Sequence, residues 1–126
     1  MKIRSKLIIA GIIGIAIFAG IYFLVSKNSE PGKLDIFAQC LKDKGAVFYG
    51  AFWCPHCQNQ KTMFGKSQKL LPYVECSTPD GKGQLAVCKE KNVTGYPMWE
   101  FSDGSRESGE VSLEKLSEKT SCPLPQ

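Results

Sequence analysis

Two cysteines three positions apart, Cys54 and Cys57, are the residues of this 126-residue chain best suited to chemistry. They enclose Pro55 and His56, and they directly follow an uncharged, aromatic run at 46–53. Such a pair can form a redox-active disulfide, one half of a metal site or a structural bridge. A bridge over three residues closes a very short loop and adds little stability, which disfavours the structural alternative.

The apolar run at 46–53 is typical of a buried strand, and the composition turns helical from Cys54 onward. A thiol in the first turn of a helix lies near unpaired backbone N–H groups and the positive end of the helix dipole, which favour the thiolate. Cys57 then lies on the same helical face and can resolve a mixed disulfide on Cys54. Pro55 suits the first turn because its missing N–H would have no intrahelical partner there.

His56 is the single histidine of the chain and lies inside the two-cysteine loop. A protonated imidazole, or one that donates a hydrogen bond to Cys54, would stabilise the thiolate further. A more stable thiolate makes the corresponding disulfide more oxidising. We therefore predict that the Cys54–Cys57 pair oxidises its targets.

The elements that position this pair follow from hydrophobic periodicity and turn residues. We expect helices at 34–45, 54–71 (with a kink at Gly65), 84–92 and 112–120, and strands at 46–53, 73–76, 97–102 and 106–111. From residue 46 the order is βαβαββα, which predicts an α/β fold with a four-stranded mixed sheet and helices on both faces. Chemistry in such a sheet gathers at the carboxyl ends of the parallel strands, where Cys54 stands.

The N-terminus predicts a membrane anchor. Residues 7–25 are nineteen consecutive residues without a charge, and a helix of that length reaches about 28 Å, close to the thickness of a bilayer core. The run ends in bulky residues without a small-x-small cleavage site, so we expect a single uncleaved transmembrane signal anchor. The three cations within 1–6 predict a cytoplasmic tail, followed outside by a linker at 26–33 and one domain at 34–126.

Charge is nearly balanced beyond the anchor. Three of the 16 basic residues precede the span, which leaves 13 against 12 acidic residues for the remainder. A nucleic-acid-binding face would need a basic patch well beyond this balance. We therefore expect no nucleic-acid partner.

Two stretches, FYGAFWCPHC at 48–57 and GYPMWEF at 95–101, resemble the thioredoxin superfamily over roughly residues 34–119. The stretch YVEC at 73–76, with Cys88 following it, resembles more narrowly the DsbA-like domains that are fused to, or partner, bacterial vitamin K epoxide reductase homologues. The resemblance implies a thioredoxin fold with an added N-terminal helix, in which Cys54 attacks and Cys57 resolves.

By the same resemblance, Pro97 is the proline that lies next to the active site in a cis peptide bond. A cis proline would expose the backbone of Tyr96 for pairing with an extended substrate strand. The alternative is a trans proline that only starts the strand. Trp53 and Trp99 are candidates to border the substrate groove, with core packing as the alternative for Trp99.

Two features depart from the family pattern. Many members place a buried carboxylate six residues before the first cysteine, where this chain has Phe48. The fused proteins also carry a quinone-reducing membrane domain of several helices, whereas a single span is predicted here. The resemblance therefore implies a separate membrane redox partner, similar to vitamin K epoxide reductase, that accepts the electrons.

Four cysteines remain. The resemblance implies a structural disulfide between Cys76 and Cys88, worth roughly 3 kcal/mol in the chain-entropy model, with a second redox pair as the alternative. Cys40 and Cys122 either bridge the added helix to the C-terminal tail or stay as free or intermolecular thiols.

These observations predict an extracytoplasmic thiol–disulfide oxidoreductase that oxidises cysteines of secreted substrate proteins and needs no cofactor besides its own disulfide. One alternative is a reductase or isomerase, for example in cytochrome c maturation. Another is a metal-binding module or copper chaperone that uses Cys54, His56 and Cys57. A zinc site would need a second closely spaced pair, and Cys76 and Cys88 are too far apart for that.

Overall fold

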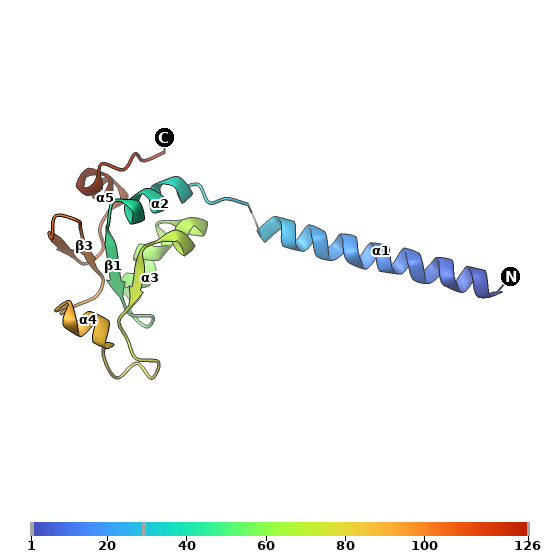
Figure 1. Cartoon of the computed structure of the whole chain (residues 1–126), viewed down its shortest axis with the longest axis horizontal. Coiled ribbons are helices and arrows are strands. Elements are labelled where there is room, and N and C mark those ends of the chain that lie inside the picture. The colour runs from blue at the N-terminus through green and yellow to red at the C-terminus, as the bar shows by residue number, and fades with distance from the viewer. Residues whose placement is uncertain (1, 29, 126) are drawn as a thin grey trace. The chain divides into compact units, whose positions relative to one another are not determined.

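The computed structural model describes residues 2–28 and 30–125, with side chains described for 7–26 and 30–125. The chain divides into two compact units, Met1–Pro31 and Gly32–Gln126. Within the first unit, helix α1 spans Lys2–Asn28 (Figure 1). The second unit contains every strand and all the other helices that the described residues form.

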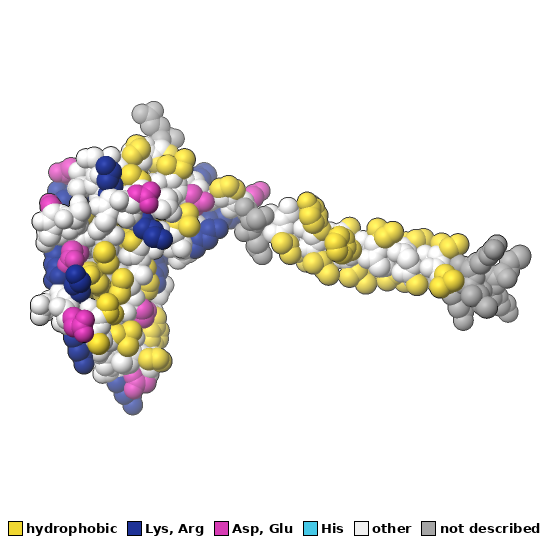
Figure 2. All heavy atoms as spheres, in the orientation of Figure 1, with side chains coloured by type: hydrophobic (Ala, Val, Ile, Leu, Met, Phe, Trp, Pro, Cys, Tyr) yellow, Lys and Arg dark blue, Asp and Glu magenta, His cyan; other side chains and the backbone are white. Residues whose placement is uncertain are grey.

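Helix α1 contains a stretch, Leu7–Ser26, with a mean hydropathy of 2.7, which is long and apolar enough to cross a membrane. Large hydrophobic side chains are exposed along the stretch, as the visible face in Figure 2 shows. The side chains of the predicted tail 1–6, and residue 29 of the predicted linker 26–33, lie outside the described residues.

The second unit is built on a four-stranded sheet with strand order β2-β1-β3-β4. Its strands are β1 (Val47–Gly50), β2 (Tyr73–Glu75), β3 (Met98–Glu100) and β4 (Arg106–Ser108). Strand β1 runs parallel to β2 and antiparallel to β3, which is antiparallel to β4. The predicted mixed sheet is therefore confirmed.

Four α-helices and one 3₁₀ helix accompany this sheet: α2 (Asp35–Asp43), α3 (Pro55–Thr62), the 3₁₀ helix η1 (Gly65–Leu70), α4 (Ala86–Glu90) and α5 (Leu113–Thr120). The helix expected at 54–71 is thus divided in two. Gly65 has a φ of +52°, a left-handed conformation that cannot continue an α-helix, so α3 ends before it. Strand β4 is shorter than expected because Gly109, with a φ of +87°, turns the chain out of the extended conformation.

The core lies on both faces of the sheet, because successive strand residues point to opposite faces. On one face Phe48 stacks on Trp99 with ring centroids 4.9 Å apart, and residues from α2, α3 and α5 cover them. On the other face Tyr49 and Met98 pack with Cys76, with Cys88 of α4 and with Val93, which follows that helix. Trp99 is fully buried, so it belongs to the core and not to an exposed groove.

A disulfide joins Cys40 on α2 to Cys122, just after α5, across 82 positions of sequence. It fastens the added N-terminal helix to the end of the domain. Together with the sheet order, this arrangement is the thioredoxin-like fold that the sequence predicts, preceded by an apolar helix.

Candidate active site

Cys54 occupies the turn that leads from β1 into α3. Its backbone is extended, with φ −80° and ψ +119°, and its carbonyl accepts the first hydrogen bond of the helix, from the amide of Gln58. Pro55 follows as the first helical residue. Cys54 is therefore the N-cap of α3, at the end of the helix where the first backbone N–H groups have no intrahelical partner.

The two sulfurs differ in access. Cys54 is 5% exposed, whereas Cys57 is fully buried, and neither is bonded to another cysteine. Burial raises the pKa of the Cys57 thiol to about 12, an effect that the hydrogen bond and charge of Cys54 reinforce and that the Ala51 backbone and Lys61 partly oppose. Cys54 thus keeps a small exposed area, while Cys57 is enclosed as a protonated thiol.

The chain segment at Tyr96 and Pro97 lies directly against Cys54, although it is about forty positions away in sequence. The Tyr96–Pro97 peptide bond is cis, and Pro97 is fully buried. The Cys54 sulfur lies 3.7 Å from the carbonyl oxygen of Tyr96. The fold thus brings the two loop cysteines and the backbone of Tyr96 together.

An exposed aromatic surface adjoins Cys54. Phe52 and Trp53 are 48% and 52% exposed although both are large and apolar. Trp53 is held in place, since its indole N–H donates to the Ser77 hydroxyl at 2.8 Å and its ring meets Tyr96 edge-on at 6.1 Å.

His56 is largely exposed and has a partner outside the cysteine loop. Its Nδ1 atom lies 2.7 Å from a carboxylate oxygen of Glu110, which also accepts a hydrogen bond from Asn59 at 3.1 Å. The His56 hydrogen bond, followed by that of Asn59, lowers the pKa of Glu110. Glu110 escaped the sequence prediction because no local pattern links it to a residue 54 positions earlier.

Gln60 is a second residue that sequence reasoning missed. It is fully buried on α3, and its side-chain oxygen accepts hydrogen bonds from the Trp99 indole at 3.2 Å and the Val111 amide at 2.7 Å. Its amide group donates to the Val111 carbonyl at 2.9 Å. Gln60 therefore fixes the helix that follows Cys54 and carries Cys57 against the sheet and the segment after β4.

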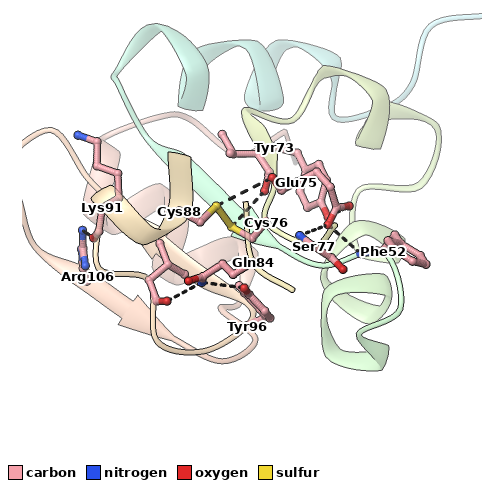
Figure 3. Close-up of a disulfide and its surroundings, with 12 residues drawn as sticks. Phe52, Tyr73, Glu75, Cys76, Ser77, Gln84, Cys88, Lys91, Tyr96 and Arg106 are labelled. Atoms are coloured by element: carbon pink, nitrogen blue, oxygen red, sulfur yellow. Dashed lines mark hydrogen bonds between the residues drawn. A yellow bond between two sulfur atoms is a disulfide. The ribbon is translucent and has the colours of Figure 1, made fainter. Parts of the chain in front are cut away.

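A disulfide between Cys76 and Cys88 lies behind the active-site turn, with Cα atoms 5.5 Å apart. Figure 3 shows Glu75, which directly precedes it, reaching from the end of β2 toward Phe52 and Ser77. One carboxylate oxygen of Glu75 accepts from the Phe52 amide at 3.2 Å and from the Ser77 amide at 2.8 Å. The disulfide-bearing strand is thus tied to the turn that presents Cys54.

Metal ligation was a predicted alternative for Cys54, His56 and Cys57. Across 2–28 and 30–125, no three or more His, Cys, Asp or Glu side chains gather closely enough to hold a metal ion. Within the cysteine loop, the Nδ1 atom of His56 is engaged by Glu110.

The fold and the arrangement of the two thiols are thioredoxin-like. Comparison with characterised proteins finds a relative named Thiol-disulfide oxidoreductase LTO1 from Arabidopsis thaliana, which is 43% identical over 107 residues. The match covers 81% of this chain but 28% of the relative, so the chain corresponds to less than a third of that protein. No family model matches the chain.

Proposed function

We propose that this chain is a thiol–disulfide oxidoreductase that transfers disulfide bonds through Cys54 and Cys57. The observation that carries the proposal is the placement of the Cys54 sulfur at the start of α3, one helical turn from Cys57 and 3.7 Å from the Tyr96 carbonyl. The printed name of the relative describes the same class of activity.

In the oxidising direction, a client thiolate attacks the Cys54 sulfur of the Cys54–Cys57 disulfide. The bond between the two protein sulfurs breaks, a mixed disulfide forms with the client, and Cys57 leaves as a thiolate and is protonated. A second client thiolate then attacks the client sulfur and releases the Cys54 thiolate. The client is oxidised by two electrons and the protein pair is reduced by two.

Recognition of the client is proposed to use the backbone of Tyr96 and the aromatic face of Trp53. Tyr96 places a carbonyl beside the attacked sulfur, and an extended client segment can pair with such a backbone. Trp53 supplies exposed apolar area next to it. Substrate proteins with accessible thiols or disulfides fit this arrangement.

The proposed location is a membrane, with α1 as a single-pass anchor and the thioredoxin-like domain on the extracytoplasmic side. The stretch Leu7–Ser26 is long and apolar enough to span, and the basic residues that precede it favour a cytoplasmic N-terminus. The reduced pair would pass its electrons to a quinone-linked membrane partner of the vitamin K epoxide reductase kind.

One observation favours the alternative of a reductase or isomerase. The carboxylate of Glu110 lies 2.7 Å from His56 and offsets the charge that a protonated imidazole would present to Cys54. A smaller stabilisation of the thiolate makes the disulfide less oxidising. The direction of electron flow is therefore the part of the proposal that the first experiment must decide.

The experiment equilibrates the full chain, in detergent, with glutathione redox buffers of different potential. Alkylation then counts the free thiols of the Cys54–Cys57 pair at each potential. A midpoint near the secretory poise of about −180 to −210 mV supports disulfide donation. A midpoint at or below the thioredoxin value of about −270 mV would reverse the proposed direction. The variant Cys57→Ser is the control, because it retains the attacking sulfur and cannot form the intramolecular disulfide.

A further inference from the structure

Four side chains form a polar cluster beneath the active-site turn, on the side of Cys57. Cys57 and Lys61 lie four positions apart on α3 and therefore share one helical face. The Lys61 ammonium lies 3.5 Å from the centre of the Tyr73 ring, and the Tyr73 hydroxyl donates to Glu75 at 2.8 Å. Helix α3 and strand β2 thus meet in a charged cluster next to a buried thiol.

Gly50, the last residue of β1, allows Cys57 and Tyr73 to approach each other closely. A methyl group built on Gly50 would lie 3.0 Å from the Cys57 sulfur, 2.7 Å from a ring carbon of Tyr73 and 3.4 Å from the Tyr73 hydroxyl oxygen. The sulfur and the hydroxyl therefore border the same small space. No side chain separates them there because residue 50 is glycine.

The carboxylate of Glu75 is held so that one oxygen faces the Tyr73 hydroxyl. One of its oxygens accepts from the backbone amides of Phe52 and Ser77, which leaves the other for the Tyr73 hydroxyl. Burial and then the Glu75 hydrogen bond raise the pKa of Tyr73, so its hydroxyl keeps its proton at neutral pH. A hydroxyl that donates to a carboxylate retains lone pairs with which it can accept another proton.

Cys57 has to exchange a proton in each catalytic cycle. With its pKa raised to about 12, its thiol is almost entirely protonated at pH 7. Solvent has no direct access, because the residue is fully buried. Proton transfer by a group within the protein would therefore accelerate the steps in which Cys57 attacks or leaves.

We propose that Tyr73 and Glu75 form a proton relay for Cys57, an inference that rests on the proposed oxidoreductase function. As Cys57 attacks a mixed disulfide on Cys54, its S–H proton passes to the Tyr73 oxygen while the Tyr73 proton passes to Glu75. The Cys54–Cys57 bond forms, the bond from Cys54 to the client sulfur breaks, and the client leaves as a thiolate. In the oxidising direction the same proton returns to the departing Cys57 sulfur.

The test uses the full chain in detergent with the Cys54–Cys57 pair selectively reduced, mixed with less than one equivalent of dithiobis(nitrobenzoate). Attack by Cys54 releases one thionitrobenzoate, and attack by Cys57 on the resulting mixed disulfide releases the second. We expect Tyr73→Phe and Glu75→Gln to leave the first release unchanged and to slow the second at least about tenfold at pH 7. Tyr73→Phe retains the ring against Gly50 and Lys61, and Glu75→Gln retains a side-chain acceptor.

Two matched variants are controls: Tyr49→Phe removes a hydroxyl on the other face of the sheet, and Glu100→Gln removes a carboxylate that pairs with Arg106. Both are expected to release the second thionitrobenzoate at the wild-type rate. The ratio of the second-release rates of wild type and Tyr73→Phe should fall toward one as the pH rises, because a larger share of Cys57 is then ionised before it attacks. Equal second-release rates in wild type and Tyr73→Phe at pH 7, or a ratio of these rates that stays constant with pH, would overturn the relay. Failure of the first release in the wild type would instead overturn the proposed function.

Discussion

The Nδ1 atom of His56 lies 2.7 Å from a carboxylate oxygen of Glu110, a residue 54 positions further along the chain. When the imidazole is protonated the two form an ion pair between the first turn of α3 and the segment that joins β4 to α5. The histidine inside the cysteine loop therefore carries a local counter-charge. This pairing sets the electrostatic surroundings of the active-site turn.

The first prediction concerns the stability of the fold in acid. The pKa of Glu110 is lower in the folded state, chiefly because of the His56 hydrogen bond. Its contribution to stability is therefore present above its unfolded pKa of about 4.3 and lost as the pH falls through the lower folded value. We expect Glu110→Gln to lose less unfolding free energy than wild type between pH 6 and pH 3, measured by urea denaturation.

The exposed carboxylate Glu90, on α4, provides the control for this measurement. The variant Glu90→Gln should follow the wild-type pH dependence. An equal loss of stability in wild type and Glu110→Gln would contradict the assignment of the pKa shift to the His56 pair.

The second prediction concerns the buried amide of Gln60. Replacement by leucine preserves much of the volume but leaves the Trp99 indole and both backbone groups of Val111 without their partner. Each buried polar group left unpaired costs roughly 1–3 kcal/mol, so we expect a loss of at least about 3 kcal/mol in the free energy of unfolding. Gln68→Leu, at an exposed site on η1, should change it by no more than about 0.5 kcal/mol. A similar effect of both substitutions would show that Gln60 is not a structural tie.

The third prediction concerns the close approach at Gly50. An alanine methyl group there would meet a Tyr73 ring carbon at 2.7 Å and the Cys57 sulfur at 3.0 Å. Because the packed core has little room to relax, we expect Gly50→Ala to destabilise the domain by about 1–3 kcal/mol in thermal denaturation. Gly95→Ala is the matched control, since a methyl group at Gly95 meets no atom within 4 Å. An unchanged melting temperature in Gly50→Ala would mean that the space beside Cys57 is larger than described.

The fourth prediction compares the two disulfides. The Cys40–Cys122 bridge closes a loop with a sequence separation of 82, against 12 for Cys76–Cys88. Because a longer loop restricts the unfolded chain more, alanine at both positions of the first pair should cost about 4.5 kcal/mol, against about 3 kcal/mol for the second. Guanidinium unfolding under non-reducing conditions measures both double variants. A larger loss on removal of Cys76–Cys88 would show that native contacts, and not loop closure, dominate its effect.

The fold was predictable from sequence because its signals are local. The aromatic run before Cys54 forms the buried strand β1, and the turn at Asp103 and Gly104 separates two antiparallel strands as expected. The boundaries were less predictable. Gly65 was expected to kink one helix, yet its left-handed backbone ends α3 and leaves a separate 3₁₀ helix behind it.

The candidate site was predictable only in part, for a related reason. Cys54 and Cys57 lie three positions apart in sequence, so their spacing places them on one helical turn before any tertiary contact is known. Glu110 and Gln60 act through contacts that cross more than fifty positions, and a glutamine within a polar helix resembles an ordinary surface residue. The polar cluster that contains Tyr73 and Glu75 likewise depends on how β2 and α3 pack together.

The bridge between Cys40 and Cys122 also determines how the domain would carry mechanical load. Cys40 lies near the start of the folded unit and Cys122 near its end, so a tension applied between the two ends runs through a covalent bond between sulfurs. The force then passes through the disulfide, and the chain between Cys40 and Cys122, which includes the sheet and the turn at Cys54, carries none of it. As long as the bridge is oxidised, the domain can be pulled from both ends without its redox site being stretched.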